Sequence, residues 1–333
     1  MTQSTTQSRK AFVEDLARKS EPFCEASVCA ASYQLVTTFG LYMATTALIF
    51  QLVQQYGAWG FLLSPIGGGL VVRMFIFQHD CGHESFLPSA RANDFVGLAM
   101  SIITGTPYEV WKREHAKHHA GSGNLNRRGV GDIDVLTVHE YLELPPLRQW
   151  WYRVMRNPLF LFFVGGPFYF IVLNRVPWGR GIPARQAARS IFGLDAVLAV
   201  VYGTLWYLFG WTLVLVLFLN LYIAMVIGVF LFYVQHQFEH TVWEPKETWD
   251  FKVAAVDGSS YLSLPPVGEW FTGSIGRHTL HHLKSRIPNY RLRTCYKACP
   301  EWEDINRLTL AEALKTIRYK LWDEEKQVMV GFP

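Results

Sequence analysis

Four stretches of this chain are long and apolar enough to cross a lipid bilayer as helices. A spanning helix needs about 20 mostly apolar residues, because the hydrocarbon core is about 30 Å thick and an α-helix rises about 1.5 Å per residue. The four stretches are 33–54, 59–78, 190–208 and 212–235. Only 17% of the 333 residues are charged and 50% are apolar, which is unusual for a soluble enzyme. The sequence therefore predicts an all-α integral membrane protein with four transmembrane helices.

The placement of Lys and Arg predicts how these helices are oriented. In membrane proteins these residues concentrate in cytoplasmic loops. The connections between the first and second stretches and between the third and fourth contain neither, whereas the N-terminal segment, the long loops and the C-terminal tail contain many. We therefore expect two transmembrane hairpins with both termini and all long loops in the cytoplasm. Two shorter apolar segments, 95–106 and 159–173, carry Gly or Pro and fit re-entrant or interfacial positions better.

The rest of the composition narrows the class of protein. We expect residues 1–32 to form a cytoplasmic N-terminal segment and residues 33–333 a single domain, because we find no internal repeat. The N-terminal segment is polar and charged, so no cleaved signal is expected. The five cysteines are odd in number and form no CxxC pair, which favours reduced thiols. The formal charge of +4 is small for this length, and we expect no nucleic-acid partner.

Histidine has the least ordinary distribution in the chain. Ten of the 11 histidines fall into four clusters, each within five consecutive residues. The clusters are His79 and His83; His115, His118 and His119; His236 and His240; and His278, His281 and His282. Counted from the first histidine of each cluster, the others follow at i+3 or i+4, which places them on one face of a helix. Each cluster thus offers a row of imidazoles that point in one direction.

The second cluster also carries the end signals of a helix. Thr106 is a candidate N-cap, Pro107 suits the first turn, and Glu109 lies three residues after Thr106. Gly121 follows the last histidine of the cluster closely, as a C-terminal signal. Together these signals predict a helix over 107–120.

A metal site explains the clusters better than separate structural roles do. A lone histidine on a helix is usually a core or surface residue, and His139, outside the clusters, is interpreted in that way. Ten crowded imidazoles repel one another when protonated, and without a metal nothing offsets that repulsion. One ion takes about four to six ligands, so the ten are enough for two ions. Because the first and third clusters end the second and fourth stretches, all four clusters can meet just below the membrane surface.

Carboxylates next to the clusters are candidates for orienting the ligands. Asp80 and Glu239 could each accept a hydrogen bond from a ligand imidazole. For Glu84 and Glu114, solvation at the surface is an equally good explanation. Imidazole suits zinc, copper, iron and nickel, so the ligand type alone leaves the metal open.

Several strings of residues resemble those of a known family. Three are similar to the histidine boxes of membrane fatty acid desaturases: HDCGHESF (79–86), HAKHH (115–119) and HTLHH (278–282). Four more resemble the bacterial-type delta-12 and omega-3 acyl-lipid branch: RANDFVG (91–97), VQHQFEH (234–240), GSSYLSLP (258–265) and RIPNYRL (286–292). The chain departs from its close relatives at His240, where they have an acidic residue. A more distant branch has asparagine at the position of His236.

The resemblance implies a particular chemistry. It implies a di-iron centre, O2 as co-substrate, and removal of two hydrogens from adjacent methylenes of a long fatty acyl chain that is linked to a membrane lipid. It also implies a separate electron donor, either ferredoxin or cytochrome b5 with its reductase, because no HPGG string marks a fused cytochrome b5 segment. It leaves open whether His236 binds iron directly.

The chemistry implied by the resemblance requires an apolar tunnel. Abstracting hydrogen from an unactivated methylene needs a strong oxidant in a dry slot. Each buried CH2 of the substrate would contribute about 0.8 kcal/mol to binding. Tyr108 and Trp111 are candidates for lining this tunnel, although an aromatic residue in such a place, taken singly, is more often a core or interfacial residue.

Two other functions stay open at this point. A hydroxylase or other oxygenase would use the same iron centre, and sequence separates it poorly from a desaturase. A metal transporter or metal sensor fits less well, because transport requires polar residues at mid-membrane depth. The four apolar stretches contain few such residues, Asp195 and Asn220 being the exceptions.

Overall fold

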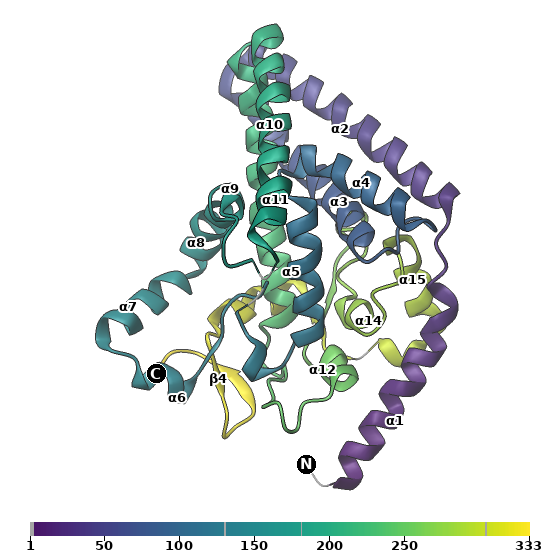
Figure 1. The fold of residues 1–333 in the computed structure, drawn as a ribbon, viewed down its shortest axis with the longest axis vertical. Helices are drawn as coiled ribbons and strands as arrows, with labels where there is room; N and C mark the ends of the chain where they lie inside the picture. Colours follow the sequence, from purple (N-terminus) through teal and green to yellow (C-terminus); the bar gives the residue numbers. More distant parts are fainter. Residues whose placement is uncertain (1–2, 130, 181, 304) are drawn as a thin grey trace.

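The computed structural model describes residues 3–129, 131–180, 182–303 and 305–333 (Figure 1). It is mostly helical, and four long helices dominate it. These are α2 (Val28–Tyr56), α3 (Ser64–Gly82), α10 (Ala184–Phe209) and α11 (Trp211–His236). Each long helix corresponds to one predicted stretch, except that the first residues of the second stretch form a 3₁₀ turn, η2 (Gly57–Leu63).

The first long helix has a side-chain cap at its start: the Ser27 hydroxyl caps α2 by accepting a hydrogen bond from the Ala30 N–H at 3.3 Å.

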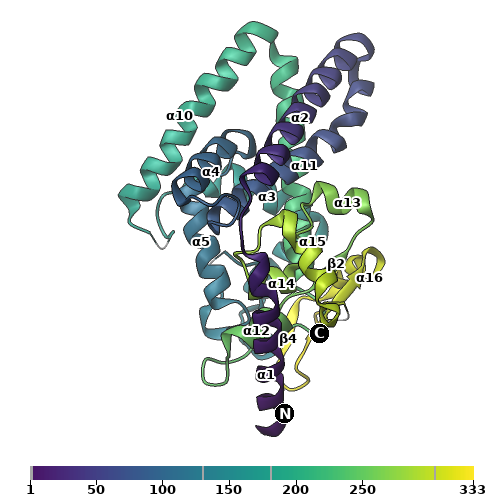
Figure 2. The ribbon, with the colours of Figure 1, turned by 90° about the vertical axis from the view of Figure 1, so that its right-hand side faces the viewer.

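Turns that contain glycine join the long helices in two pairs. Gly57 ends α2 with φ 62°, and Gly210 joins α10 to α11 with φ 77°. Glycine adopts these positive angles without steric cost. Figure 2 shows both turns at one end of the molecule, with α1 (Gln3–Ser20) at the other.

Four segments of the described chain are long and apolar enough to cross a membrane. They are Val28–Gly82, which contains both α2 and α3, Pro158–Arg175, Ala184–Phe209 and Trp211–His236. The segment Pro158–Arg175 is an addition to the four predicted stretches. It is a broken helix that consists of α8 (Pro158–Phe160), one turn of π-helix, η4 (Leu161–Gly165), α9 (Gly166–Ile171) and a 3₁₀ turn, η5 (Leu173–Arg175). The other short apolar segment lies largely in α4 (Ala90–Thr104), whose Phe95 is exposed.

Helices α3 and α11 pack closely because α3 contains consecutive glycines. A Cβ on Gly67 would lie 2.5 Å from the side chain of Asn220, and a Cβ on Gly68 would lie 2.5 Å from that of Ile223. Small residues allow helix backbones to approach closely in this way. The contact holds the ends of α3 and α11, and therefore two histidine clusters, at a fixed separation.

Shorter helices surround the end of the long helices that carries the histidines (Figure 1). They are α5 (Tyr108–Gly121), α6 (Val138–Glu143), α7 (Pro146–Met155), α12 (Phe251–Asp257), α13 (Pro266–Phe271), α14 (His278–Leu283), α15 (Asn289–Ala298) and α16 (Leu310–Lys315). Buried side chains of α1, including Val13 and Leu16, belong to one core cluster with Leu292 of α15 and Trp302. This apolar contact fixes the N-terminal helix to the others.

In the part of the chain that the structure describes, five short strands modify the all-α expectation. They are β1 (Leu136–Thr137), β2 (Tyr261–Ser263), β3 (Arg307–Thr309), β4 (Leu321–Asp323) and β5 (Val328–Val330). One sheet has the order β1-β4-β5, with β1 parallel and β5 antiparallel to β4, and β2 pairs with β3 in parallel. Each strand has only two or three residues, which is too short for an alternating pattern to reveal it in the sequence.

Candidate metal centre

Helix α5 supplies one histidine cluster, as its spacing predicted. It runs from Tyr108 to Gly121, within a residue of the predicted helix 107–120. The N-cap prediction for Thr106 is wrong: Pro107 occupies the N-cap position and caps no backbone N–H with its side chain. The Thr106 hydroxyl instead donates to the Thr104 carbonyl at 3.3 Å. Proline fits here because its fixed φ suits the start of a helix.

The other clusters lie at the ends of helices or on a short helix. His79 is in the last turn of α3, and His83 follows directly after that helix. His236 is the last residue of α11. His278, His281 and His282 lie on α14 and are buried.

Nine histidines form two adjacent groups. We call His79, His83, His115, His119 and His281 the five-histidine group, and His118, His236, His278 and His282 the four-histidine group. Within each group one nitrogen of every imidazole lies within 4.8 Å of the others. This arrangement has the form of a site for two metal ions.

Helices α5 and α14 each contribute to both groups. On α5, His115 and His119 are four residues apart and join the five-histidine group, whereas His118 joins the other. On α14, His278 and His282 are four residues apart and join the four-histidine group, whereas His281 joins the other. Residues at i and i+4 lie almost above one another on a helix, so each such pair faces one centre.

The distances between nitrogens fit metal ligation. The Nε2 atom of His236 lies 3.2 Å from Nε2 of His118 and 3.1 Å from Nε2 of His278. In the other group, Nε2 of His119 lies 3.1 Å from Nε2 of His115 and 3.1 Å from Nε2 of His281. Two imidazole nitrogens that each lie about 2.0–2.1 Å from one ion are about 3 Å apart, so these separations suit a shared metal ion.

The protonation state of the grouped histidines also favours metal binding. Burial, together with neighbouring imidazoles, lowers the pKa of His119, His281 and His282 well below the usual value for histidine. These side chains are therefore neutral at neutral pH. Each then has an unprotonated nitrogen that can bind a metal ion.

Asp80 orients a histidine of the five-histidine group. One carboxylate oxygen accepts a hydrogen bond from Nδ1 of His79 at 3.0 Å. The other accepts from the backbone N–H and the side-chain amide of Asn289, at 2.6 and 2.8 Å. A hydrogen bond to Nδ1 leaves Nε2 as the metal-binding nitrogen. The structure thus gives Asp80 the orienting geometry expected of it.

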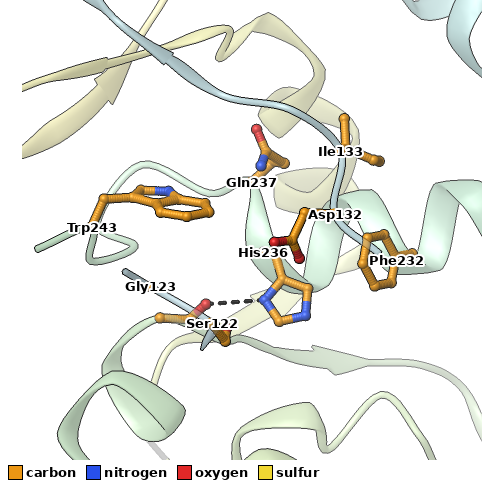
Figure 3. Close-up of a pocket in the computed structure, with 9 residues that line it drawn as sticks. Ser122, Gly123, Asp132, Ile133, Phe232, His236, Gln237 and Trp243 are labelled. Atoms are coloured by element: carbon orange, nitrogen blue, oxygen red, sulfur yellow. Dashed lines mark hydrogen bonds between the residues drawn. The ribbon is translucent and has the colours of Figure 1, made fainter. Parts of the chain in front are cut away.

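In the four-histidine group, Asp132 and a backbone carbonyl orient two histidines through their Nδ1 atoms, as Asp80 orients His79. The Asp132 carboxylate pairs with Nδ1 of His118. Nδ1 of His236 donates to the Gly258 carbonyl at 3.2 Å, and a dashed line in Figure 3 marks a hydrogen bond at His236. Figure 3 also shows Asp132, Phe232 and His236 around a small cavity of about 10 Å³. Sequence reasoning did not find Asp132, because it lies 14 residues after His118 in a loop without regular spacing.

The structure does not bring His240 or Glu239 to the metal centre. Helix α11 ends at His236, so the i,i+4 relation assumed for His240 does not exist, and His240 is exposed outside both groups. Glu239 is exposed as well, and it accepts a hydrogen bond from the Tyr319 hydroxyl in the C-terminal segment. The reason in both cases is that the chain leaves the helix at Gln237, whose φ and ψ are −116° and 65°.

The remaining polar candidates have partners away from the histidines. Glu84 lies 3.4 Å from the Lys112 ammonium. Glu114 is buried, and its carboxylate lies 3.0 Å from the Arg180 guanidinium. His139 is exposed and lies 3.6 Å from Glu143.

The two proposed tunnel residues differ in their contacts. Tyr108 is fully buried, and its hydroxyl donates to the Cys81 carbonyl or to Asp94, each at 3.0 Å, so it connects α5 to α3 and α4. Trp111 stacks on the ring of His115, with centroids 4.5 Å apart. Trp111 therefore borders the metal centre, whereas Tyr108 packs behind it.

One more aromatic ring, Phe232, borders the centre, and a second, Phe75, packs against Trp111. Phe75 packs edge-on against Trp111 at 5.3 Å, and Phe232 lies 5.1 Å from His118 and 5.2 Å from His236. An apolar groove of about 300 Å³ lies between α2, α3 and α4, and Phe77 in its wall is two residues before His79. Apolar surface therefore lies near the end of α3 that carries His79.

Comparisons with known proteins agree with this geometry. The family model described as fatty acid desaturase matches residues 28–307. The chain is 33% identical to a fatty acid desaturase of Bacillus subtilis (strain 168) over 320 residues, which cover 96% of this chain and 90% of that protein.

Two more distant relatives carry more specific names. A protein of Synechocystis sp. named sn-1 acyl-lipid omega-3 desaturase (ferredoxin) is 27% identical, over 79% of this chain and 75% of that protein. A delta(12)-fatty-acid desaturase of Vernicia fordii is also 27% identical, over 80% of this chain and 73% of that protein. The match to the family model and the similarity to the Bacillus protein span both histidine groups, and the chain belongs to the fatty acid desaturase family.

Proposed function

We propose that this protein catalyses the O2-dependent desaturation of a long fatty acyl chain and inserts a cis double bond. The observation that supports this most is the convergence of nine buried or half-buried histidines, from four separate parts of the chain, into two adjacent groups. The proposed metal ligands are these nine residues, and His240 is no longer among them.

The proposed cofactor is a pair of iron ions. The five-histidine and four-histidine groups would each hold one ion, and the short distances between Nε2 atoms suit this assignment. Bound iron would supply, together with O2, the oxidising power that breaking an unactivated C–H bond requires. Asp80 and Asp132 would hold His79 and His118 in the ligating orientation.

The proposed substrate is an acyl chain linked to a membrane lipid. Trp111 and Phe232 present ring surfaces beside the histidines, Phe75 packs against Trp111, and the apolar groove between α2, α3 and α4 reaches the same level of α3. These rings would exclude water from the reacting methylenes, which protects them from side reactions. The acyl-lipid name of the Synechocystis relative supports the same substrate class.

The reaction requires a separate electron donor. Forming one double bond releases two electrons and two protons, whereas reducing O2 to two molecules of water takes four of each. Two electrons and two protons must therefore come from elsewhere. The proposed donor is ferredoxin, or cytochrome b5 with its reductase, and the Synechocystis relative carries the word ferredoxin in its name.

The proposed membrane arrangement has α2, α3, α10 and α11 as two spanning hairpins, with the metal centre on the cytoplasmic side. Both uncharged turns lie at one end of the molecule and α1 lies at the other (Figure 2). The Lys and Arg residues outside the long helices then face the cytoplasm. In this arrangement residues 1–32 form a cytoplasmic segment and 33–333 one desaturase domain, although α2 itself already begins at Val28.

The test is to express the chain in a host whose lipids are only saturated and monounsaturated, together with a ferredoxin and its reductase, and to profile fatty acids by mass spectrometry. We expect a new double bond with the wild-type chain and with His139→Ala, but not with His281→Ala. A hydroxylated product would show the oxygenase reaction instead. An unchanged profile with the donor present would contradict the proposal.

A further inference from the structure

Helix α5 carries its three histidines on one side and a row of cations on the other. Arg113 and Lys117, four residues apart, are both exposed. Arg127 extends the row, because it is exposed and its guanidinium donates to the Ala120 carbonyl near the end of α5 at 3.2 Å. We call Arg113, Lys117 and Arg127 the basic stripe.

The basic stripe has one acidic residue in line with it on α5, Glu109, which lies four residues before Arg113 at the start of the helix. Of the two acidic residues of that helix, Glu109 is half-buried in the first turn, and Glu114 is buried against Arg180. The Arg127 guanidinium is further held over the ring of Trp249, at 5.7 Å. Like charges gathered on one face create a positive surface potential that attracts an oppositely charged partner and accelerates its association.

The position of the stripe matters because α5 provides ligands to both histidine groups. His115 and His119 join the five-histidine group and His118 the four-histidine group, all from the opposite side of the same helix. A helix with its side chains is about 10–12 Å across, so a partner on the stripe is separated from both groups by α5 alone. Figure 2 shows α5 on the left side of the molecule, below α10 and α4.

The stripe also extends farther than a lipid surface would explain. Arg113 and Ala120 are seven residues apart, which is about 10 Å along the helix. Figures 1 and 2 show α5 running away from the turns of the long helices, so the stripe leads away from the proposed membrane. The polar headgroup layer on each side of a bilayer is only about 5–8 Å thick. A soluble partner therefore fits the stripe better than lipid headgroups.

The proposed reaction takes two electrons from outside, and the inference that follows rests on that proposed function. We propose that the basic stripe is the docking surface for an acidic electron-carrier protein, which delivers electrons across α5 to the metal centre. Charge complementarity of this kind mainly raises the association rate and makes it sensitive to salt.

The test compares charge reversal on the stripe with charge reversal elsewhere. The variant is Arg113→Glu with Lys117→Glu. The matched control is Lys297→Glu with Lys315→Glu, two exposed lysines on α15 and α16, which Figure 2 shows on the opposite side from α5. The probes are an oxidised [2Fe–2S] ferredoxin and the soluble haem domain of cytochrome b5. Their binding to the full chain in nanodiscs is measured at low and high salt.

We expect at least one probe to bind the wild-type chain, and its Kd to rise about tenfold or more in the stripe variant at low salt. The control should stay within about twofold of the wild type. High salt should reduce the difference between the variant and the wild type. The inference is overturned if neither probe binds the wild-type chain, or if the control weakens binding as much as the stripe variant does. Loss of binding to anionic vesicles with unchanged probe binding would make the stripe a lipid site instead.

A second measurement separates this inference from the proposed function. The protein is reduced anaerobically with dithionite and methyl viologen, small molecules that need no docking surface, and the excess reductant is removed before O2 is added for a single turnover. We expect the stripe variant to form the unsaturated product at the wild-type rate under these conditions, and to be slow only with the protein donor. Equal slowing with both reductants would refute a docking role. Absence of product from the wild-type chain would count against the proposed function. The binding of the two probes would still show whether the basic stripe is a docking surface.

Discussion

The two histidine groups are alike in composition but differ in how the chain builds them. In the five-histidine group the orienting carboxylate, Asp80, is next to the histidine that it contacts. In the four-histidine group the orienting groups, Asp132 and the Gly258 carbonyl, come from loops 14 and 22 residues away from their histidines. The first group therefore depends mainly on local helix geometry, whereas the second depends on how loops pack around the end of α11.

Removing a histidine from either group should have the largest effect. We expect His281→Ala, in the five-histidine group, and His282→Ala, in the four-histidine group, each to abolish desaturation and to lower iron content, because the reaction needs both ions. Iron per chain is measured by mass spectrometry of the purified protein, and His139→Ala serves as the control. Full activity in either variant would show that the two groups are not equally required.

Removing an orienting carboxylate should have the next largest effect. Asp80→Asn and Asp132→Asn should each weaken iron binding by about 10–100-fold, the usual effect of losing such a partner of a metal-bound histidine. Competition with a chelator measures this affinity. If the comparison of the groups is correct, Asn289→Ala, which removes a hydrogen bond to Asp80, should weaken binding at the five-histidine group alone.

A buried cation near the four-histidine group gives a pH-dependent prediction. Lys320 is buried, and burial together with Arg156 lowers the pKa of its ammonium to about 7. Arg156 in turn donates to Gln237, the residue after His236, at 2.7 Å. Between pH 7 and about 10.5 the unfolded chain holds a proton on Lys320 that the folded chain does not, so stability rises with pH in this window.

The measurement is thermal unfolding of Lys320→Met against the wild type. Lys320→Met should raise Tm at pH 7, and the gain should shrink as the pH approaches 10. Lys315→Met, at an exposed position of α16, should show no such trend. A gain independent of pH would mean that burial of the charge does not cause the effect.

The smallest effects should come from substitutions at two candidate site residues that lie outside both histidine groups. His240→Ala and Glu239→Gln should keep iron content and activity within about twofold of the wild type, because both side chains are exposed outside the histidine groups. Fatty acid profiles and iron analysis are the measurements. A tenfold loss in His240→Ala would mean that the loop after α11 closes over the centre when iron binds.

These contrasts show which parts of the molecule can be predicted from the sequence. The long apolar helices and the helix α5 were predictable, because hydropathy over about 20 residues and i,i+4 spacing are local properties. The helix face expected to join His236 and His240 does not form, because the i,i+4 spacing was extended beyond the last residue of α11. Neither Asp132 nor the strands of two or three residues left a local signal, since long-range packing of loops determines their positions.

The split of α5 and α14 between the two groups has a consequence for how such a sequence can change. Adding a residue in a loop between clusters only lengthens that loop. Adding one residue between His115 and His118 would instead turn the later histidines by about 100° around the helix, because a turn contains 3.6 residues. Both groups would lose ligands at once. Length variation in descendants of this chain should therefore accumulate between the histidine clusters and be absent within them.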